Sequence, residues 1–132
     1  MINESFRATW SPRLLSVLRI VVALLFLEHG LSKYFNFPAP TPASFHAVSI
    51  LGLAGAIEII ASVLVAIGLF TRVAAFVASG EMAVAYFMVH FPKSFFPLVN
   101  GGEAAVLYCF IFLFIALEGG GPWSIDATRS RR

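Results

Sequence analysis

The chain has 132 residues, of which 59% are apolar and only 12% are charged, and its mean hydropathy is +0.88. A soluble domain of this length has a more polar composition, so these values exclude one and predict an integral membrane protein. The formal net charge of +2 gives no basic surface for a nucleic acid, and the single cysteine, Cys109, excludes an intrachain disulfide.

The chain contains four apolar stretches of the length that a membrane-spanning helix needs, which is about 20 residues at ~1.5 Å each. We predict spans at about 14–35, 48–70, 73–91 and 101–118. Because little chain is left over, we expect residues 1–132 to form a single transmembrane domain. Its predicted fold class is all-α, an integral membrane four-helix bundle with antiparallel up-down topology.

Helix boundaries are marked by capping residues. Ser11 and Pro12 predict the N-cap and the first helical residue of the first helix. The apolar run that follows continues into Glu28 without an Ala-x-Ala site, which favours a retained helix over a cleaved signal peptide. Gly68 and Thr71 predict a helix stop and the next N-cap, and therefore a tight hairpin between the second and third helices.

Basic residues indicate the orientation. They gather around the first helix, in the second connection and at the carboxyl terminus: Arg7, Arg13, Arg19, Arg72, Arg129, Arg131 and Arg132. The other two connections offer only Lys33 and Lys93. Since cytoplasmic connections carry the excess of basic residues, we predict that both termini lie in the cytoplasm, N-in and C-in.

Two helices have distinct packing patterns. The third carries small residues four positions apart, at Ala75, Ser79 and Ala83, a spacing that lets membrane helices approach closely. The fourth is rich in large rings, at Phe110, Phe112 and Phe114. We therefore expect the third helix to be central and the rings of the fourth to face lipid.

Each span carries one glutamate: Glu28, Glu58, Glu81 and Glu103. A charged residue at a helix centre costs roughly 2.5–3.5 kcal/mol on insertion, so the default expectation is an inward-facing polar site. Glu103 has a structural explanation, because a carboxylate is favourable in the first turn of a helix. The other three do not, and since burial and like charges disfavour ionised carboxyls, they are the candidates for proton exchange.

The first helix supplies candidate partners for these carboxyls. One stripe of it contains Arg19, Phe26, Gly30 and Lys33, with His29 beside the stripe, and is predicted to face the bundle interior. Arg19 and Glu81 lie at similar depths, which makes an ion pair between the first and third helices a candidate. Lys33 either snorkels to the outer interface or joins the polar cluster.

A dinuclear metal centre in a four-helix bundle needs Glu-x-x-His on two helices. Three residues after the glutamates come Leu31, Ala61, Val84 and Val106. We therefore expect no metal site.

The motifs together carry a family resemblance. They are Leu18-Arg19-Ile20 through Glu28-His29-Gly30-Leu31-Ser32-Lys33, Gly55 to Glu58, Gly68-Leu69-Phe70-Thr71-Arg72, Ser79-Gly80-Glu81-Met82-Ala83, Asn100-Gly101-Gly102-Glu103 and Pro122-Trp123-Ser124-Ile125-Asp126. In these segments the chain resembles the DoxX family of small four-helix bacterial membrane proteins. The resemblance implies a multi-pass protein of the bacterial inner (plasma) membrane.

Some members of that family are subunits of quinone-linked sulfur oxidoreductases or belong to membrane-associated redox complexes. The resemblance thus implies a membrane subunit of a redox system, with other proteins of that system as partners and a quinone as the candidate cofactor. It assigns the binding site to Arg19, His29, Lys33, Glu58, Glu81 and Glu103. Within it, Arg19 would hold a carboxylate, His29 and Lys33 would contact the polar head, and Glu58 with Glu81 would exchange protons.

Two other functions remain open from the residues. One is a proton-coupled carrier of a small solute, which at 132 residues would call for a homo-oligomer. The other is an accessory protein whose polar cluster only fixes helix packing. The residues do not decide whether the chain is an enzyme; if it is one, the expectation is an oxidoreductase subunit.

Overall fold

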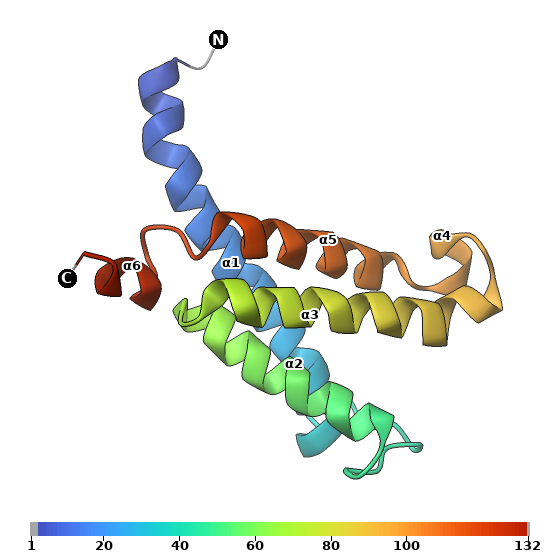
Figure 1. Cartoon of the computed structure of the whole chain (residues 1–132). Helices are drawn as coiled ribbons and strands as arrows, with labels where there is room; N and C mark the ends of the chain where they lie inside the picture. The colour runs from blue at the N-terminus through green and yellow to red at the C-terminus, as the bar shows by residue number, and fades with distance from the viewer. Residues whose placement is uncertain (1–2, 132) are drawn as a thin grey trace.

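The computed structural model describes residues 3–131, and within them the chain is all-α with no β-strand (Figure 1). The long helices are α1 (Glu4–Phe35), α2 (Ile50–Ile67), α3 (Thr71–Ala85) and α5 (Glu103–Glu118). Shorter turns are the π-helix η1 (Tyr86–His90), the 3-10 helix η2 (Phe91–Lys93), α4 (Pro97–Asn100) and α6 (Ile125–Arg129). The predicted all-α class is confirmed.

Three helical runs are long and apolar enough to cross a membrane: α1, α2 and the continuous run Thr71–Lys93 that α3 begins. They correspond to the first three predicted spans. The fourth predicted span forms α5, which has 16 residues and is shorter.

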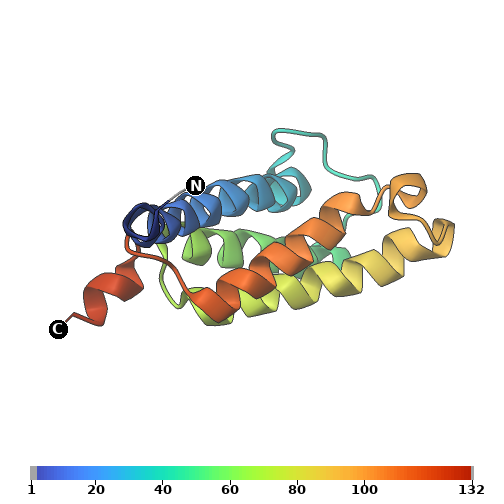
Figure 2. The ribbon, with the colours of Figure 1, turned by 90° about the horizontal axis from the view of Figure 1, so that it is seen from above.

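The long helices associate in two pairs. α2 packs along α1, α3 packs along α5, and the tight turn at residues 68–70 joins the pairs (Figures 1 and 2). The core between them contains Phe26, Val65, Ala78, Phe112 and Ile115. We call the end with residues 36–49 and 91–102 the loop end, and the end with residues 68–70 and 119–129 the tail end.

The start of α1 differs from the prediction. The helix begins at Glu4, and its N-cap is Asn3, whose side chain accepts a hydrogen bond of 2.8 Å from the N–H of Phe6. Pro12 lies inside the helix, where it bends the helix instead of starting it, because an interior proline removes one backbone hydrogen bond. Figures 1 and 2 show the first turns pointing away from the direction of the rest of the helix.

The tight hairpin between α2 and α3 is confirmed, but its cap is not the predicted one. Gly68 ends α2 in the left-handed conformation with φ 72°, and its N–H bonds to carbonyls of the last turn. Thr71 is the first residue of α3 rather than its N-cap. The carboxylate of Asp126 caps this helix instead, accepting from the N–H groups of Phe70 at 3.0 Å and Thr71 at 2.9 Å.

The interface of α3 with α5 shows why one expectation about α5 was wrong. Phe110 and Phe114 are exposed as predicted, but Phe112 is 0% exposed and its ring lies 4.9 Å from that of Phe26. The small residues of α3 do allow a close approach, since the hydroxyl of Ser79 donates to the carbonyl of Cys109 at 2.7 Å. Phe112 therefore lies on the inner face of α5, in the core that it shares with Phe26 of α1.

Candidate functional site

A buried ion pair joins α1 to α2. The Nζ of Lys33 lies 2.7 Å and 2.6 Å from the two carboxylate oxygens of Glu58, and the Glu58 side chain is 3% exposed. Glu81 of α3 lies within the electrostatic reach of both groups. We call Lys33, Glu58 and Glu81 the polar centre, and it realises the predicted grouping of the first helix with the hairpin that follows it.

Glycines explain how Lys33 reaches Glu58. A Cβ on Gly30 would lie 2.6 Å from the side chain of Ile59 and 3.0 Å from the carbonyl of Gly55, so α1 and α2 touch there through their backbones. A Cβ on Gly55 would lie 3.1 Å from the Lys33 stem. The two glycines therefore let the helices approach closely enough for the ammonium and the carboxylate to meet.

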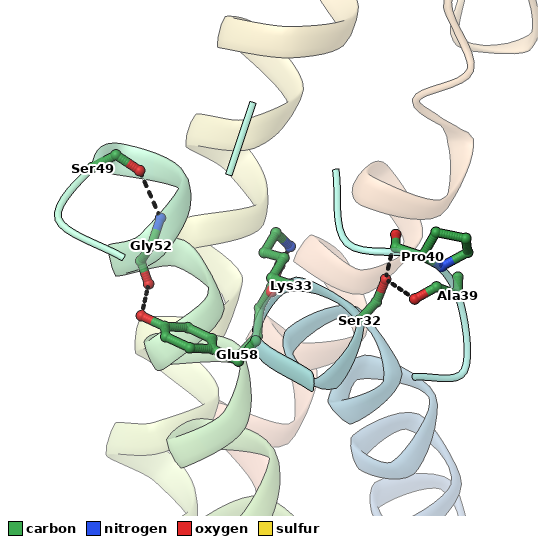
Figure 3. A network of polar contacts seen from close by, with 8 residues as sticks. Ser32, Lys33, Ala39, Pro40, Ser49, Gly52 and Glu58 are labelled. Atoms are coloured by element: carbon green, nitrogen blue, oxygen red, sulfur yellow. Dashed lines mark hydrogen bonds and ion pairs between the residues drawn. The ribbon is translucent and has the colours of Figure 1, made fainter. Parts of the chain in front are cut away.

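Hydrogen bonds at the loop end fix the orientation of this part of α1. The hydroxyl of Tyr34 donates to the carbonyl of Gly52 at 2.8 Å, and the hydroxyl of Ser32 donates to the carbonyl of Ala39 at 3.0 Å (Figure 3). Ser49 caps α2 by accepting from the N–H of Gly52. Lys33 thus stands between two anchored neighbours.

Glu58 lies at the middle of α2, which runs from Ile50 to Ile67, so about 12 Å of helix separates it from either end. A carboxylate at this depth is stable only when it is paired and hydrogen-bonded. Lys33 provides both, so it does not snorkel away from the bundle.

Glu81 completes the polar centre but is differently placed. Its side chain is half-buried, and within residues 3–131 its Oε2 atom is buried without a hydrogen-bond partner. The centre thus holds two carboxyl groups and one ammonium, and the ammonium contacts only Glu58. Such a centre is electrically neutral only when one carboxyl holds a proton, and Lys33 already binds both oxygens of Glu58, so Glu81 is the natural place for that proton.

Other predicted site residues lie outside the centre. Glu28 is exposed and does not face the interior, because it is two positions from both Phe26 and Gly30, which point inward, and so projects from the opposite side of α1. His29 is also exposed, with its ring edge-on to Tyr108 of α5 at 5.8 Å. Glu103 is exposed in the first turn of α5, in agreement with its structural interpretation.

Arg19 makes no ion pair with Glu81, contrary to the prediction. Its guanidinium donates to four backbone carbonyls: those of Val65 and Ala66 at 2.5 Å, Trp123 at 2.5 Å and Gly120 at 2.8 Å. The residue is 0% exposed. Helix ends leave carbonyls without intrahelical partners, and arginine, with five donors, satisfies those at the end of α2 together with those of the tail. Arg19 is therefore a positioning residue.

Comparison with known proteins identifies the family of the chain. The DoxX family model matches residues 14–91, which is more than half of the chain. The chain belongs to the DoxX family. The matched segment of this DoxX protein contains the whole polar centre and Arg19.

Two relatives of this DoxX protein align over nearly the whole chain. An uncharacterized protein of Haemophilus influenzae is 45% identical over 122 residues, which cover 89% of this chain and 91% of that protein. An uncharacterized membrane protein of Mycobacterium tuberculosis is 26% identical over 155 residues, which cover 99% of this chain and 94% of that protein. No solved structure matches.

At the tail end of this DoxX protein, a second arginine donates hydrogen bonds to backbone carbonyls, as Arg19 does, which the sequence did not reveal. Arg72 donates to the carbonyls of Ala116, Leu117 and Glu118, the last turn of α5. The signal was present in Gly68 and Gly119, since each marks a helix end where carbonyls lack partners. The sequence predicted a carboxylate partner for Arg19, whereas backbone oxygens bind both Arg19 and Arg72.

Asp126 is the other tail residue that sequence reasoning missed. Burial pushes the pKa of its carboxyl upward, but hydrogen bonds from Thr71 and Phe70 and the charge of Arg129 outweigh burial and hold the pKa below its ordinary value. The carboxylate therefore stays ionised and caps α3 at neutral pH. Its backbone N–H also donates to the carbonyl of Gly68 at 2.9 Å.

Two hollows lie at the tail end, away from the polar centre. One, of about 470 Å³, is lined by Thr71, Arg72, Gly120 and Asp126, among others. The other is an apolar groove of about 1120 Å³ between the first half of α1 and Phe114. Across the described residues, no three histidine, cysteine or acidic side chains gather closely enough to hold a metal ion.

Proposed function

We propose that this DoxX protein is the membrane subunit of a redox system in which the polar centre exchanges protons with a quinone taken from the bilayer. We further propose that it crosses the inner membrane of a bacterium four times, with α5 as the fourth span and both termini in the cytoplasm. The observation that carries the proposal is the buried Oε2 of Glu81, which has no hydrogen-bond partner in the described chain beside the paired Lys33 and Glu58.

The chemistry of the polar centre supports proton exchange. Lys33 and Glu58 neutralise each other, so the charge of the centre is set by whether Glu81 is protonated. A buried carboxyl beside another carboxylate favours its protonated form, and it can pass that proton to an acceptor within hydrogen-bond reach. Glu58 and Lys33 keep their pairing and act as the fixed part of the site.

Two polar side chains near the centre support a quinone as the ligand. His29 is exposed on α1, and the ring of Tyr108 on α5 lies edge-on to it, so an imidazole N–H and a phenol O–H are available to donate to a carbonyl oxygen. Both side chains lie within membrane-spanning helices, where a lipophilic ligand arrives from the side. A quinone, when bound, supplies electron transfer coupled to protonation, and the chain supplies orientation and a proton at Glu81.

Redox-induced infrared difference spectroscopy tests this proposal. The purified protein in nanodiscs is loaded with decylubiquinone, and the quinone is reduced electrochemically. We expect a change in the stretch of a protonated carboxyl in the native protein, its loss in Glu81→Gln, and its retention in Glu118→Gln, which alters an exposed glutamate at the tail end. Absence of quinone binding, or an unchanged signal in Glu81→Gln, overturns the proposal.

Liposomes separate the proposal from a carrier function. A redox subunit does not accumulate a solute when a proton gradient is imposed. Proton-driven uptake by liposomes that contain the protein, with no quinone bound, would replace the redox function by that of a proton-coupled carrier.

A further inference from the structure

The segment that joins η2 to α5 exposes four large apolar side chains. They are Phe95, Phe96, Leu98 and Val99, which are between 63% and 79% exposed, and we call them the loop-end patch. The only charged residue between Glu81 and Glu103 is Lys93, which comes just before the patch. A patch of this kind marks a surface that something other than water covers.

The lengths of two neighbouring helices set the depth of this segment. α3 and α5 are level at the tail end, because Arg72 in the first turn of α3 donates to carbonyls in the last turn of α5. From that level the run Thr71–Lys93, with 23 residues, extends roughly 35 Å, and α5, with 16 residues, extends about 24 Å. Since the hydrocarbon core of a bilayer is about 30 Å thick, α5 alone is about 6 Å too short to cross it.

The contacts of Gly102 agree with these lengths. A Cβ on Gly102 would lie 2.7 Å from the ring of Tyr86 and 2.8 Å from the Cβ of His90. The start of α5 is therefore level with η1 and not with Lys93 at the end of the run. Figures 1 and 2 show α4 beside the end of this run, where the chain folds back towards α5.

The buried side chain of Asn100 binds the polar backbone groups of this fold. Asn100 is 3% exposed, and its amide N–H groups donate to the carbonyl of Ser94 at 2.9 Å and to the hydroxyl of Tyr86 at 3.2 Å. Its Oδ1 accepts from the N–H of Gly102 at 2.7 Å, and its carbonyl lies 3.1 Å from Nδ1 of His90. Non-helical backbone inside a bilayer needs such partners within the protein, whereas water can serve them in an aqueous loop.

We propose that residues 95–99 insert into the bilayer leaflet at the loop end as a re-entrant turn, with the loop-end patch among the acyl chains near the lipid ester groups. Lipid is the occupant because this segment adds the length that α5 lacks for a complete crossing. Lys93 lies at the turning point, where its ammonium faces the headgroups. The inference rests on α5 being the fourth span and does not depend on quinone binding.

Fluorescence quenching in liposomes that contain only this protein tests the insertion. Trp10→Phe and Trp123→Phe remove the two natural tryptophans, and Phe96→Trp then reports on the patch. Phe110→Trp, on an exposed position about 12 Å from the end of α5, is the deep reference, and Ser44→Trp, in the other connection of the loop end, is the aqueous reference.

We expect lipid brominated near the ester end of its chains to quench Phe96→Trp most strongly, and lipid brominated near the methyl end to quench Phe110→Trp most strongly. Aqueous iodide is expected to quench only Ser44→Trp. The preference of tryptophan for the interface acts in all three variants, so their differences report the position of the chain.

Two results for Phe96→Trp overturn the inference. One is iodide quenching as strong as that of Ser44→Trp, which places the patch in water. The other is protection from both quenchers, which shows that protein covers the patch. If Phe110→Trp is quenched by lipid and Phe96→Trp is not, only the insertion fails; if lipid does not quench Phe110→Trp, the fourth crossing fails.

Asn100→Ala tests how the segment is held in the bilayer. The carbonyl of Ser94 and the N–H of Gly102 then lose their partner, so we expect lipid quenching of Phe96→Trp to fall and iodide quenching to appear. Asn36→Ala is the control, because it removes an amide whose oxygen accepts from the N–H of Thr41 in the other connection. Unchanged lipid quenching of Phe96→Trp in Asn100→Ala would contradict the role of the amide.

Discussion

The ion pair of Lys33 with Glu58 is costly to break by removing one partner. Both groups have left water, and the energy of that transfer is offset only by their mutual contact at 2.6–2.7 Å. Removing one partner leaves the other buried and charged. The pair therefore supports folding, and in the proposed function it is also the fixed part of the site.

Lys33→Met tests the structural contribution of the pair. We expect the free energy of unfolding to fall by about 3–5 kcal/mol, because the Glu58 carboxylate remains buried without its ammonium. The measurement is reversible unfolding in mixed detergent, followed by circular dichroism. Lys93→Met, which alters an exposed lysine at the loop end, is the control and is expected to change stability by less than ~0.5 kcal/mol.

A second substitution distinguishes loss of pairing from loss of packing. Adding Glu58→Leu to Lys33→Met removes the stranded carboxylate, so the double variant is expected to regain most of the lost stability. If the double variant is as unstable as Lys33→Met alone, the stem of the lysine rather than its charge supports the fold.

The sequence identified Lys33, Glu58 and Glu81 as candidate site residues but not the contact between Lys33 and Glu58. Depth along the helices paired Glu81 with Arg19 and left Lys33 either at the outer interface or in the polar cluster. It failed for Arg19, whose acceptors are the backbone oxygens of a helix end and of the glycine-rich tail. The inward-facing position predicted for Glu28 was also wrong. The buried stripe of α1 is too narrow to include Glu28, which projects from the opposite side of the helix.

The α1 and α2 helices approach closely because Gly30 and Gly55 have no side chains. Gly30 lies against the backbone of Gly55 and Ile59, and the distance between the helices sets the length that Lys33 must span. Any added atom at Gly30 separates the two helices. The geometry of the polar centre thus depends on Gly30, which has no side chain.

Gly30→Ala is expected to lower the free energy of unfolding by about 1–3 kcal/mol, the usual cost of overpacking. The new Cβ would lie 3.0 Å from backbone atoms of α2, which cannot turn aside as a side chain can. Gly80→Ala is the matched control on α3, since no atom lies within 4 Å of its added Cβ. Unfolding of the two variants in mixed detergent is the measurement, and equal losses of stability would contradict the close approach.

Helix types and most helix ends could be predicted from the apolar periodicity and the glycines. The start of α1 could not, because Ser11 and Pro12 form a convincing start signal while Asn3, further upstream, is the actual cap. The cap of α3 could not either, because Asp126 is brought to Phe70 and Thr71 by the tertiary fold. Local patterns do not reveal a cap that comes from the other end of the chain.

On the scale of the whole molecule, the two ends are built differently. Backbone carbonyls held by arginines close the tail end, whereas the loop end is closed by hydroxyl groups and by short helical turns. The predicted orientation puts the arginine-rich tail end in the cytoplasm. The antiparallel helix pairs of the structure keep Arg72 and Arg129 at that same end.

Thiol labelling in intact bacteria tests the four-span topology with both termini inside. In a Cys109→Ser background, Ser94→Cys at the loop end is expected to react with a membrane-impermeant maleimide from outside. Ser130→Cys at the tail end is expected to react only after the inner membrane is permeabilised. Labelling of Ser130→Cys in intact cells would contradict the orientation, and labelling of both sites from the same side would contradict the odd number of crossings between them.

The contacts of Arg19 also have a consequence for folding during synthesis. Two of its acceptors, the carbonyls of Gly120 and Trp123, lie 101 and 104 residues further along the chain. The ribosome therefore delivers the guanidinium to the membrane long before it delivers these oxygens. A nascent chain that stops short of Gly120 keeps a cation in hydrocarbon with half of its acceptors missing. The hydrogen bonds of Arg19 are therefore complete only in a chain that includes Gly120 and Trp123.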